Sequence, residues 1–190
     1  MPYNGQSETM EIWEAIKAAP FTGAERLVAE YGDRLFGAAL MLSQESHSAE
    51  DLVSRTICQA VVKIGLFDPA YSFWNWLYTI LLNFYRTDLR KCKAEVADEP
   101  DYVEEQSKTG DVPDANLSAV DAELMREAVA RLPPSLRIVV LLRYFEDRTL
   151  DEIAQITGAP SGTVKVRLHR ARKQLNRILS TLFGKEDGRK

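Results

Sequence analysis

Apolar residues recur in this chain at intervals of three and four, and this spacing limits the chain to helical folds. The pattern holds for about five turns between Phe21 and Ser43, at Leu27, Val28, Tyr31, Leu35, Phe36, Ala39 and Leu42. Similar patterns predict a helix from Ser48, as N-cap with Asp51 three residues later, to about Ile64, and another from Phe73 to about Lys91. No segment alternates as a half-buried strand does, so we predict an all-α fold.

Turn and cap residues divide the last third of the chain into short helices. A helix predicted from Ser118 to Arg131 ends before Pro133-Pro134, and the apolar segment PSLRIVVLLRYFED follows. Thr149 and Glu152 then form a capping-box pattern, and Gly158 stands where a left-handed residue ends a helix. Ser161 is positioned to cap the next helix. Two helices joined by a tight turn containing glycine predict a helix-turn-helix.

Charge is distributed unevenly and suggests two domains. Residues 93–116 hold two basic and eight acidic residues with two prolines, whereas residues 117–190 hold fourteen basic and nine acidic residues. The acidic segment has no periodic apolar face and reads as a flexible linker. We therefore predict an N-terminal extension (1–20), a first helical domain (21–92), an acidic linker (93–117), a second helical domain (118–183) and a tail (184–190).

Several classes of protein are not expected from the composition. No run of about 18 apolar residues is present, and the acidic N-terminus is unlike an export signal, so the cytoplasm is the default compartment. Cys58 and Cys92 have no further ligand at metal-binding spacing. We find no catalytic constellation or phosphate-binding loop, and we expect neither an enzyme nor a cofactor.

The segment SGTVKVRLHRARKQLNR, residues 161–177, holds six basic and no acidic residues in a chain of formal net charge -4. On a helical wheel, Val164, Leu168, Ala171 and Leu175 share one stripe that we expect to pack inward. A helix with a small N-terminal end and basic flanks suits a DNA major groove, although a solvated basic face is the alternative reading. The predicted DNA contacts are Arg148, Ser161, Thr163, Lys165, Val166, Arg167, Arg170 and Lys173.

These residues resemble region four of bacterial sigma factors, which binds the minus-thirty-five promoter element. The resemblance is carried by Leu132-Pro133, Glu152-Ile153-Ala154, Gly158, Gly162-Thr163-Val164-Lys165 and Arg170-Ala171-Arg172. The first domain resembles sigma region two, through Glu50-Asp51-Leu52-Val53, Phe73, Trp76-Leu77, Ile80, Asn83, Asp88 and Arg90-Lys91. The two regions in this order resemble the extracytoplasmic-function (ECF) group. The segments WLYTILLN and YRTDLRK further resemble the general-stress sigma factors of alphaproteobacteria.

The resemblance implies that the first domain holds the minus-ten element open, a task for which aromatic rings beside cations are suited. We expect Phe73, Trp76 and Phe84 to be core. The loop Asp68–Ser72 corresponds to the family's specificity loop, but it lacks glycine. The predicted minus-ten contacts are Tyr71, Trp74, Asn75, Tyr78, Asn83, Arg86, Arg90 and Lys91.

The resemblance also implies protein partners. Asp51, Leu52 and Arg55 are predicted to bind core RNA polymerase, although Ser54 and Arg55 stand where the family has glutamine and an acid, and Thr79 replaces a usual basic residue. An anti-sigma factor is expected as a regulator, with Leu82 among its contacts. The acidic linker is either a tether or an occupant of a basic nucleic-acid channel.

Three functions fit these sequence features. The leading one is a transcription initiation factor that binds core RNA polymerase, recognises the minus-ten and minus-thirty-five elements of promoter DNA and assists melting. A conventional helix-turn-helix regulator would bind DNA without polymerase. A sigma mimic would sequester an anti-sigma factor without starting transcription.

Overall fold

The protein forms two helical units in the computed structural model, which describes residues 5–95 and 122–186, with side chains described for 10–92 and 123–182. The units, Met1–Glu99 and Pro100–Lys190, are considered separately. The described residues contain helices and turns but no strand, so the all-α prediction is confirmed for them. The predicted acidic linker lies outside the described residues from position 96 to its end. No described helix is long and apolar enough to cross a membrane.

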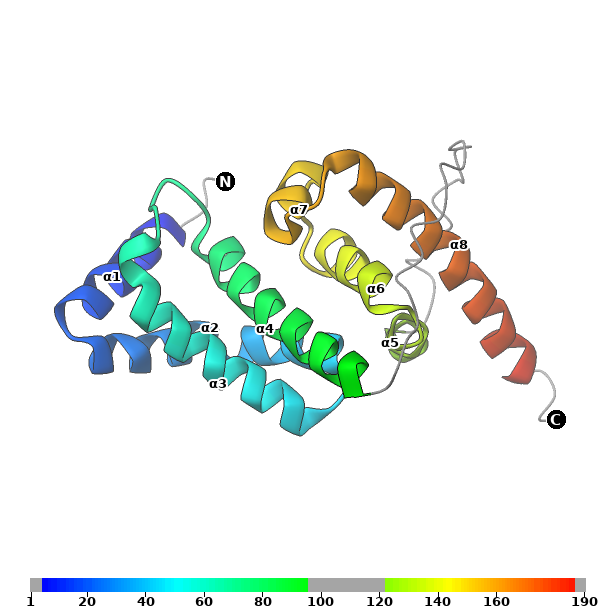
Figure 1. Ribbon diagram of the computed structural model, residues 1–190, viewed down its shortest axis with the longest axis horizontal. Coiled ribbons are helices and arrows are strands. Elements are labelled where there is room, and N and C mark those ends of the chain that lie inside the picture. The colour runs from blue at the N-terminus through cyan, green and yellow to red at the C-terminus, as the bar shows by residue number, and fades with distance from the viewer. Residues whose placement is uncertain (1–4, 96–121, 187–190) are drawn as a thin grey trace. The chain divides into compact units, whose positions relative to one another are not determined.

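The described part of unit 1, residues 5–95, forms four α-helices and a 3-10 turn; Figure 1 shows their arrangement. Their bounds are α1 Gly5–Ala18, α2 Pro20–Ser43, α3 Ser46–Lys63, η1 Ile64–Leu66 and α4 Phe73–Glu95. Helix α2 packs against α1, α3 and α4, and α4 also packs against α3. The core is built from the apolar stripe of α2, where Leu27, Leu35 and Leu42 are fully buried, and from Leu77 and Leu81 of α4. Full burial of each such side chain stabilises the fold by about 1.5–3 kcal/mol.

The turn between α2 and α3 corrects the predicted N-cap. Gln44 takes the left-handed conformation with φ 62° and ends α2. Glu45, not Ser48, caps α3: its carboxylate accepts hydrogen bonds from the backbone N–H groups of His47, at 2.9 Å, and Ser48. These bonds satisfy donors that a helix N-terminus otherwise leaves unpaired. Hydrogen bonding by the Ser48 side chain, with these backbone bonds beside it, holds the pKa of the Glu45 carboxyl below its ordinary value.

Helix α1 occupies most of the segment predicted only as an N-terminal extension. Ile12 and Ile16 are 5% and 1% exposed and anchor α1 on the rest of unit 1. Gly23 allows this close approach, because a Cβ atom at position 23 would lie 2.3 Å from the Ile16 Cα atom. Helix α1 also contacts η1, which leads into the Asp68–Ser72 loop.

Unit 2 contains α5 Ala122–Ala130, α6 Pro134–Val140, the π-helical turn Leu141–Phe145, α7 Leu150–Thr157 and α8 Ser161–Glu186. Residues 118–121 of the helix predicted from Ser118 to Arg131 lie outside the described part. Helices α5, α6 and α7 each pack against α8 (Figure 1). Arg137 secures the end of α5 by donating hydrogen bonds to the carbonyl oxygens of Ala130, at 2.6 Å, and Leu132, at 3.1 Å. The long helix α8 is therefore held by the three helices that precede it.

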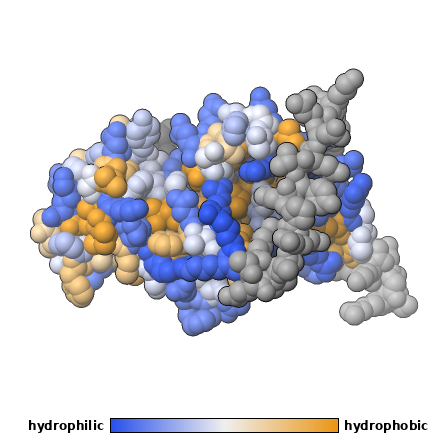
Figure 2. Space-filling model, viewed as in Figure 1, coloured by the Kyte–Doolittle hydropathy of each residue, from blue (hydrophilic) through white to orange (hydrophobic). Residues whose placement is uncertain are grey.

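Apolar side chains reach the surface of unit 1 at the end formed by α1, α2 and α3 (Figure 2). Among the described residues of unit 1, the most exposed large apolar side chains are Phe21 and Val62, each 79% exposed, and Leu66, 76% exposed. Val62 and Leu66 are four residues apart, at the end of α3 and in η1. They therefore lie just before the Asp68–Ser72 loop.

Candidate nucleic-acid and polymerase interface

The turn chemistry predicted for the helix-turn-helix is confirmed. The Thr149 backbone N–H donates to Glu152 Oε2 at 2.9 Å, and the Glu152 N–H donates to Thr149 Oγ1 at 3.2 Å, which completes the capping box. Gly158 takes φ 67°, a conformation that side chains with a Cβ atom disfavour. The prediction that Ser161 caps α8 is wrong. Ser161 is the first residue of α8, and its hydroxyl donates to Asp151 Oδ1 at 3.2 Å.

The two faces of α8 are sorted as the helical wheel predicted. Val164, Leu168, Ala171 and Leu175 are between 0% and 5% exposed, so the stripe packs inward. Most predicted DNA contacts lie off this stripe: Lys165 and Lys173 are exposed, and Thr163, Val166, Arg167 and Arg170 are half-buried. Gly162 is exposed, and a Cβ atom there would meet nothing within 4 Å. The first turn of α8 thus has the open, small surface that a major-groove helix needs.

Arg148 differs from the other predicted contacts because the fold already uses it. Its side chain is 17% exposed, and its Nη1 atom lies 3.3 Å from Glu152 Oε1. Arg143 Nη1 donates to the Arg148 carbonyl oxygen at 2.9 Å. Arg148 therefore stabilises the start of α7 through the acid of its capping box.

The Asp68–Ser72 loop is fixed at both ends. Phe67 and Phe73 flank it, and their ring centroids lie 4.9 Å apart in an edge-to-face contact. Within the loop, Asp68 Oδ1 accepts from the Ala70 N–H at 2.9 Å and the Asp68 carbonyl accepts from the Tyr71 N–H at 3.0 Å. Tyr71 is 66% exposed. The loop thus presents one aromatic ring from a constrained backbone, and Phe67, which closes it, was not singled out from the sequence.

Burial corrects the predicted roles of Trp74 and Tyr78. Trp74 is 4% exposed, with the Tyr31 ring stacked on it at 6.1 Å and the Arg34 guanidinium carbon 4.0 Å from its ring centroid. Tyr78 is 1% exposed and meets Trp74 edge to face at 5.7 Å. In this conformation neither ring offers a face to an unpaired base. Tyr71 is the aromatic minus-ten candidate that remains accessible.

The polar candidates of α4 are distributed along its length. Asn75 is half-buried in the first turn, where its backbone N–H donates to Ser72 Oγ at 3.3 Å. Asn83, Arg90 and Lys91 are exposed, and Arg86 is half-buried. The hydroxyl of Thr79, at the position usually basic in the family, donates to the Asn75 carbonyl at 2.7 Å. The cations therefore gather in the second half of α4. Leu82, the expected anti-sigma contact, is fully buried, so that prediction is wrong for this conformation.

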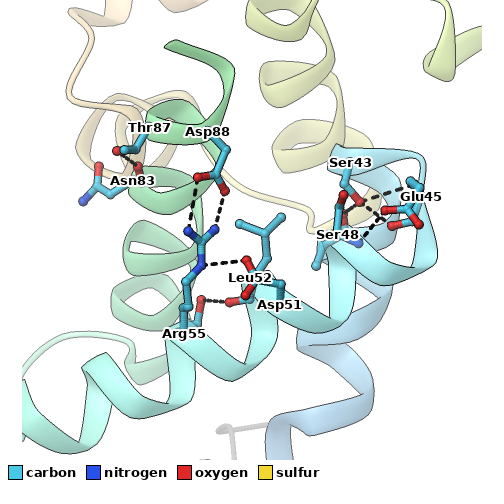
Figure 3. A network of polar contacts seen from close by, with 11 residues as sticks. Ser43, Glu45, Ser48, Asp51, Leu52, Arg55, Asn83, Thr87 and Asp88 are labelled. Carbon is cyan, nitrogen blue, oxygen red and sulfur yellow. Dashed lines mark hydrogen bonds and ion pairs between the residues drawn. The ribbon is translucent and has the colours of Figure 1, made fainter. Parts of the chain in front are cut away.

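The predicted polymerase contacts of α3 have three different environments (Figure 3). The Asp51 side chain is 59% exposed, whereas Leu52 is 2% exposed and packs in the core. The structure therefore contradicts a direct contact by Leu52. Arg55 Nη1 donates to Asp88 Oδ1 at 3.1 Å, its Nη2 donates to Asp88 Oδ2, and its Nε lies 3.0 Å from Asp51 Oδ2. Hydrogen bonding to Asp88 raises the pKa of the Arg55 guanidinium. Both Asp88 and Arg55 were singled out from the sequence, but their pairing across 33 residues was not predicted.

Comparison with known proteins finds the same two regions. Residues 27–95 match the family model for sigma-70 region 2, and residues 122–175 match the model for sigma-70 region 4. The chain is 30% identical over 161 residues to the ECF RNA polymerase sigma factor SigW of Bacillus subtilis strain 168, covering 80% of this chain and 86% of SigW. It is 33% identical over 141 residues to the ECF RNA polymerase sigma factor EcfG of Rhodopseudomonas palustris strain TIE-1, covering 74% and 76%.

A solved structure agrees with these matches. The sigma factor RpoE of Bartonella quintana, in complex with the anti-sigma factor NepR, superposes with a TM-score of 0.63 and 28% identity, covering 82% of this chain and 96% of RpoE. The two matched regions and the helix-turn-helix define a sigma factor of the sigma-70 family. Within that family, the chain belongs to the extracytoplasmic-function group, as its similarity to SigW and EcfG shows. Its assignment to the general-stress subgroup stays a prediction.

Proposed function

We propose that this sigma factor acts in the cytoplasm, directing core RNA polymerase to promoters by reading one DNA element with each unit. The observation that carries the proposal is the presence, in one chain, of a region 2 unit and a region 4 unit whose helix α8 buries its apolar stripe and exposes Lys165 and Lys173. This arrangement allows DNA recognition at two separate sites. It needs no catalytic residue in the chain.

In unit 2, α8 reads the minus-thirty-five element. Lys165 and Lys173 are exposed cations that can bind phosphates or guanine edges, and Arg167 and Arg170 flank them on the same helix. The methyl groups of Thr163 and Val166 can contact thymine methyl groups. Ser161 and Arg148 contribute by fixing the helix-turn-helix, since their side chains bind Asp151 and Glu152.

In unit 1, the Asp68–Ser72 loop and α4 engage the melted minus-ten element. Tyr71 offers the accessible aromatic ring, and a base stacked on such a ring gains about 1–3 kcal/mol. Because the loop is closed by Phe67 and Phe73, Tyr71 loses little conformational freedom on binding. Asn83, Arg86, Arg90 and Lys91 then follow the strand along α4. Trp74 and Tyr78 support the loop from the protein side.

The polymerase binds to the exposed face of α3. Glu50, Asp51 and Ser54 are exposed there, with Asp51 supplying the carboxylate that the family resemblance assigns to polymerase binding. Leu52 acts beneath this face as a core residue. Arg55 forms ion pairs with Asp51 and Asp88, so its role at this face is to hold the Asp51 carboxylate in place.

An anti-sigma factor regulates the protein in this proposal. RpoE, whose fold this chain shares, was solved with the anti-sigma factor NepR. Val62 and Leu66, four residues apart at the end of α3 and in η1, are exposed apolar side chains that such a partner could cover, as is Phe21 at the start of α2, in place of the buried Leu82. Leu66→Asp is expected to weaken anti-sigma binding without unfolding the protein, which a pull-down and a thermal melt measure together.

Run-off transcription with core polymerase and a promoter library tests the main proposal. We expect initiation from a subset of promoters that share both elements, and loss of initiation when Lys165 and Arg167 are replaced by glutamine. Specific DNA binding without polymerase, together with no initiation, would identify a conventional regulator instead. Anti-sigma binding with no initiation from any promoter would identify a sigma mimic.

A further inference from the structure

Asp88 is an acidic residue in a basic part of α4. Between residues 86 and 91 the other charged side chains are Arg86, Arg90 and Lys91, which are the proposed strand contacts. A carboxylate at this position would repel DNA phosphates and attract the neighbouring cations. The structure shows how this charge is balanced.

The balance comes from Arg55 of α3, which binds both oxygens of the Asp88 carboxylate (Figure 3). The guanidinium carbon also lies 4.9 Å from the centroid of the Phe84 ring, and Nε lies 3.0 Å from Asp51 Oδ2. The Arg55 and Asp88 side chains are only 30% and 36% exposed. Arg55 is thus held on three sides in a bidentate geometry that a mobile surface ion pair lacks.

Lys91 is the cation that Asp88 would capture if Arg55 were absent. It follows Asp88 by three residues, a spacing at which side chains of opposite charge meet on a helix. Lys91 is exposed. A carboxylate released from Arg55 would therefore pair with Lys91 and withdraw it from the strand.

We propose that Arg55 is a positioning residue that serves as the internal counter-ion of Asp88 and thereby leaves Lys91 for the phosphates of the melted strand. The proposal rests on the proposed function, in which α4 contacts the minus-ten element. It assigns Arg55 a role inside unit 1 and not a direct contact with polymerase. It also predicts that the two partners of the ion pair are not equivalent: loss of Arg55 is harmful only while the Asp88 charge remains.

The experiment measures binding of the reconstituted holoenzyme to a labelled promoter fragment whose minus-ten element is left unpaired, over a range of salt concentrations. Arg55→Met is expected to weaken binding about threefold to tenfold and to reduce the salt slope by about one, the effect of losing one phosphate contact. Asp88→Asn is expected to bind as well as the wild type or better. The double variant, Arg55→Met with Asp88→Asn, is expected to recover to within about twofold.

Lys91→Gln provides an independent test of the proposal. It should weaken binding in the wild-type protein but cause no further loss in the Arg55→Met protein, where Lys91 is already withdrawn. Arg126→Met is the matched control, because Arg126 forms an exposed ion pair with Glu123 in α5 and its loss removes the same charge. Thermal melts verify that each variant is folded.

Three results would overturn the proposal. Equal losses of promoter binding in Arg55→Met and Asp88→Asn, without recovery in the double variant, would show that the ion pair is needed only to hold α3 against α4. Weaker binding to core polymerase that persists in the double variant would show a direct polymerase contact. If Arg55→Met does not fold, Arg55→Lys replaces it, because lysine keeps the charge but not the bidentate contact. DNA binding near the wild-type level would support the counter-ion role, and a loss of DNA binding would show that the bidentate contact itself is needed. Failure of the wild-type holoenzyme to bind any promoter would instead refute the proposed function.

Discussion

Gly23→Ala tests the close packing of α1 on α2. An added Cβ atom would lie 2.3 Å from Ile16 Cα and 2.5 Å from Ile16 N, whereas carbon atoms in contact lie about 3.5–4.0 Å apart. Both clashing atoms belong to the backbone, so α1 must move as a whole by about 1 Å or more. Such overpacking costs about 1–3 kcal/mol. Alanine is also a better helix former than glycine by about 1 kcal/mol, which offsets part of this cost.

Gly37→Ala is the control, because Gly37 lies in the same helix and a Cβ atom there meets nothing within 4 Å. Both substitutions gain the same helix propensity, so the difference between the two variants isolates the contact with Ile16. We expect the free energy of unfolding of Gly37→Ala to exceed that of Gly23→Ala by about 1–3 kcal/mol. Each kcal/mol of this difference should raise the thermal midpoint by about 4–8 °C. Urea and thermal unfolding, followed by circular dichroism and tryptophan fluorescence, measure this difference. Equal stability of the two variants would refute the close approach of α1.

Thr149→Ala should lower the free energy of unfolding of unit 2 by about 0.5–2 kcal/mol through loss of the α7 cap, whereas Thr149→Ser should retain most of it; denaturant titration compares them. Leu168→Ala should lower the free energy of unfolding by about 2–5 kcal/mol because the Leu168 side chain is buried. Lys165→Gln should instead change stability by less than about 0.5 kcal/mol, yet weaken promoter binding and lower its salt slope by about one; an unchanged slope would count against a phosphate contact. The pKa of Glu45 is lowered in the fold, so its cap contribution is full above the unfolded-chain pKa and is lost as pH falls through the folded pKa. Thermal midpoints of wild type and Glu45→Ala should therefore converge in acid, and a constant gap would contradict the cap.

Local sequence chemistry predicted the helix-turn-helix closely. The Thr149–Glu152 capping box, the left-handed Gly158 and the inward stripe from Val164 to Leu175 all follow from contacts within one or two turns. The helices at residues 20–43 and 73–95 were predicted for the same reason, since one apolar face is visible in a single segment. Composition and spacing were therefore sufficient where the interactions are local.

Competition between neighbouring residues explains the errors at helix starts. Ser48 and Ser161 are good capping residues by type, but Glu45 lies nearer the first free N–H groups of α3, and Asp151 binds the Ser161 hydroxyl. Helix α1 was not predicted because, among its described side chains (residues 10–18), only Ile12 and Ile16 are buried, and acidic residues stand between and beside them. Its burial depends on Gly23, which carries no apolar signal.

The sequence by itself determined the helical class, the order of the two units and the basic recognition helix, because periodicity, caps and charge are properties of short segments. Only the tertiary structure decided which side chains are available to partners. A wheel of α4 cannot tell that Trp74 lies against Tyr31 and Arg34, and the sequence of the preceding loop cannot tell that Tyr71 stays exposed. Nor can it tell that Arg55 neutralises Asp88, since that ion pair joins two helices whose approach depends on packing of the whole unit.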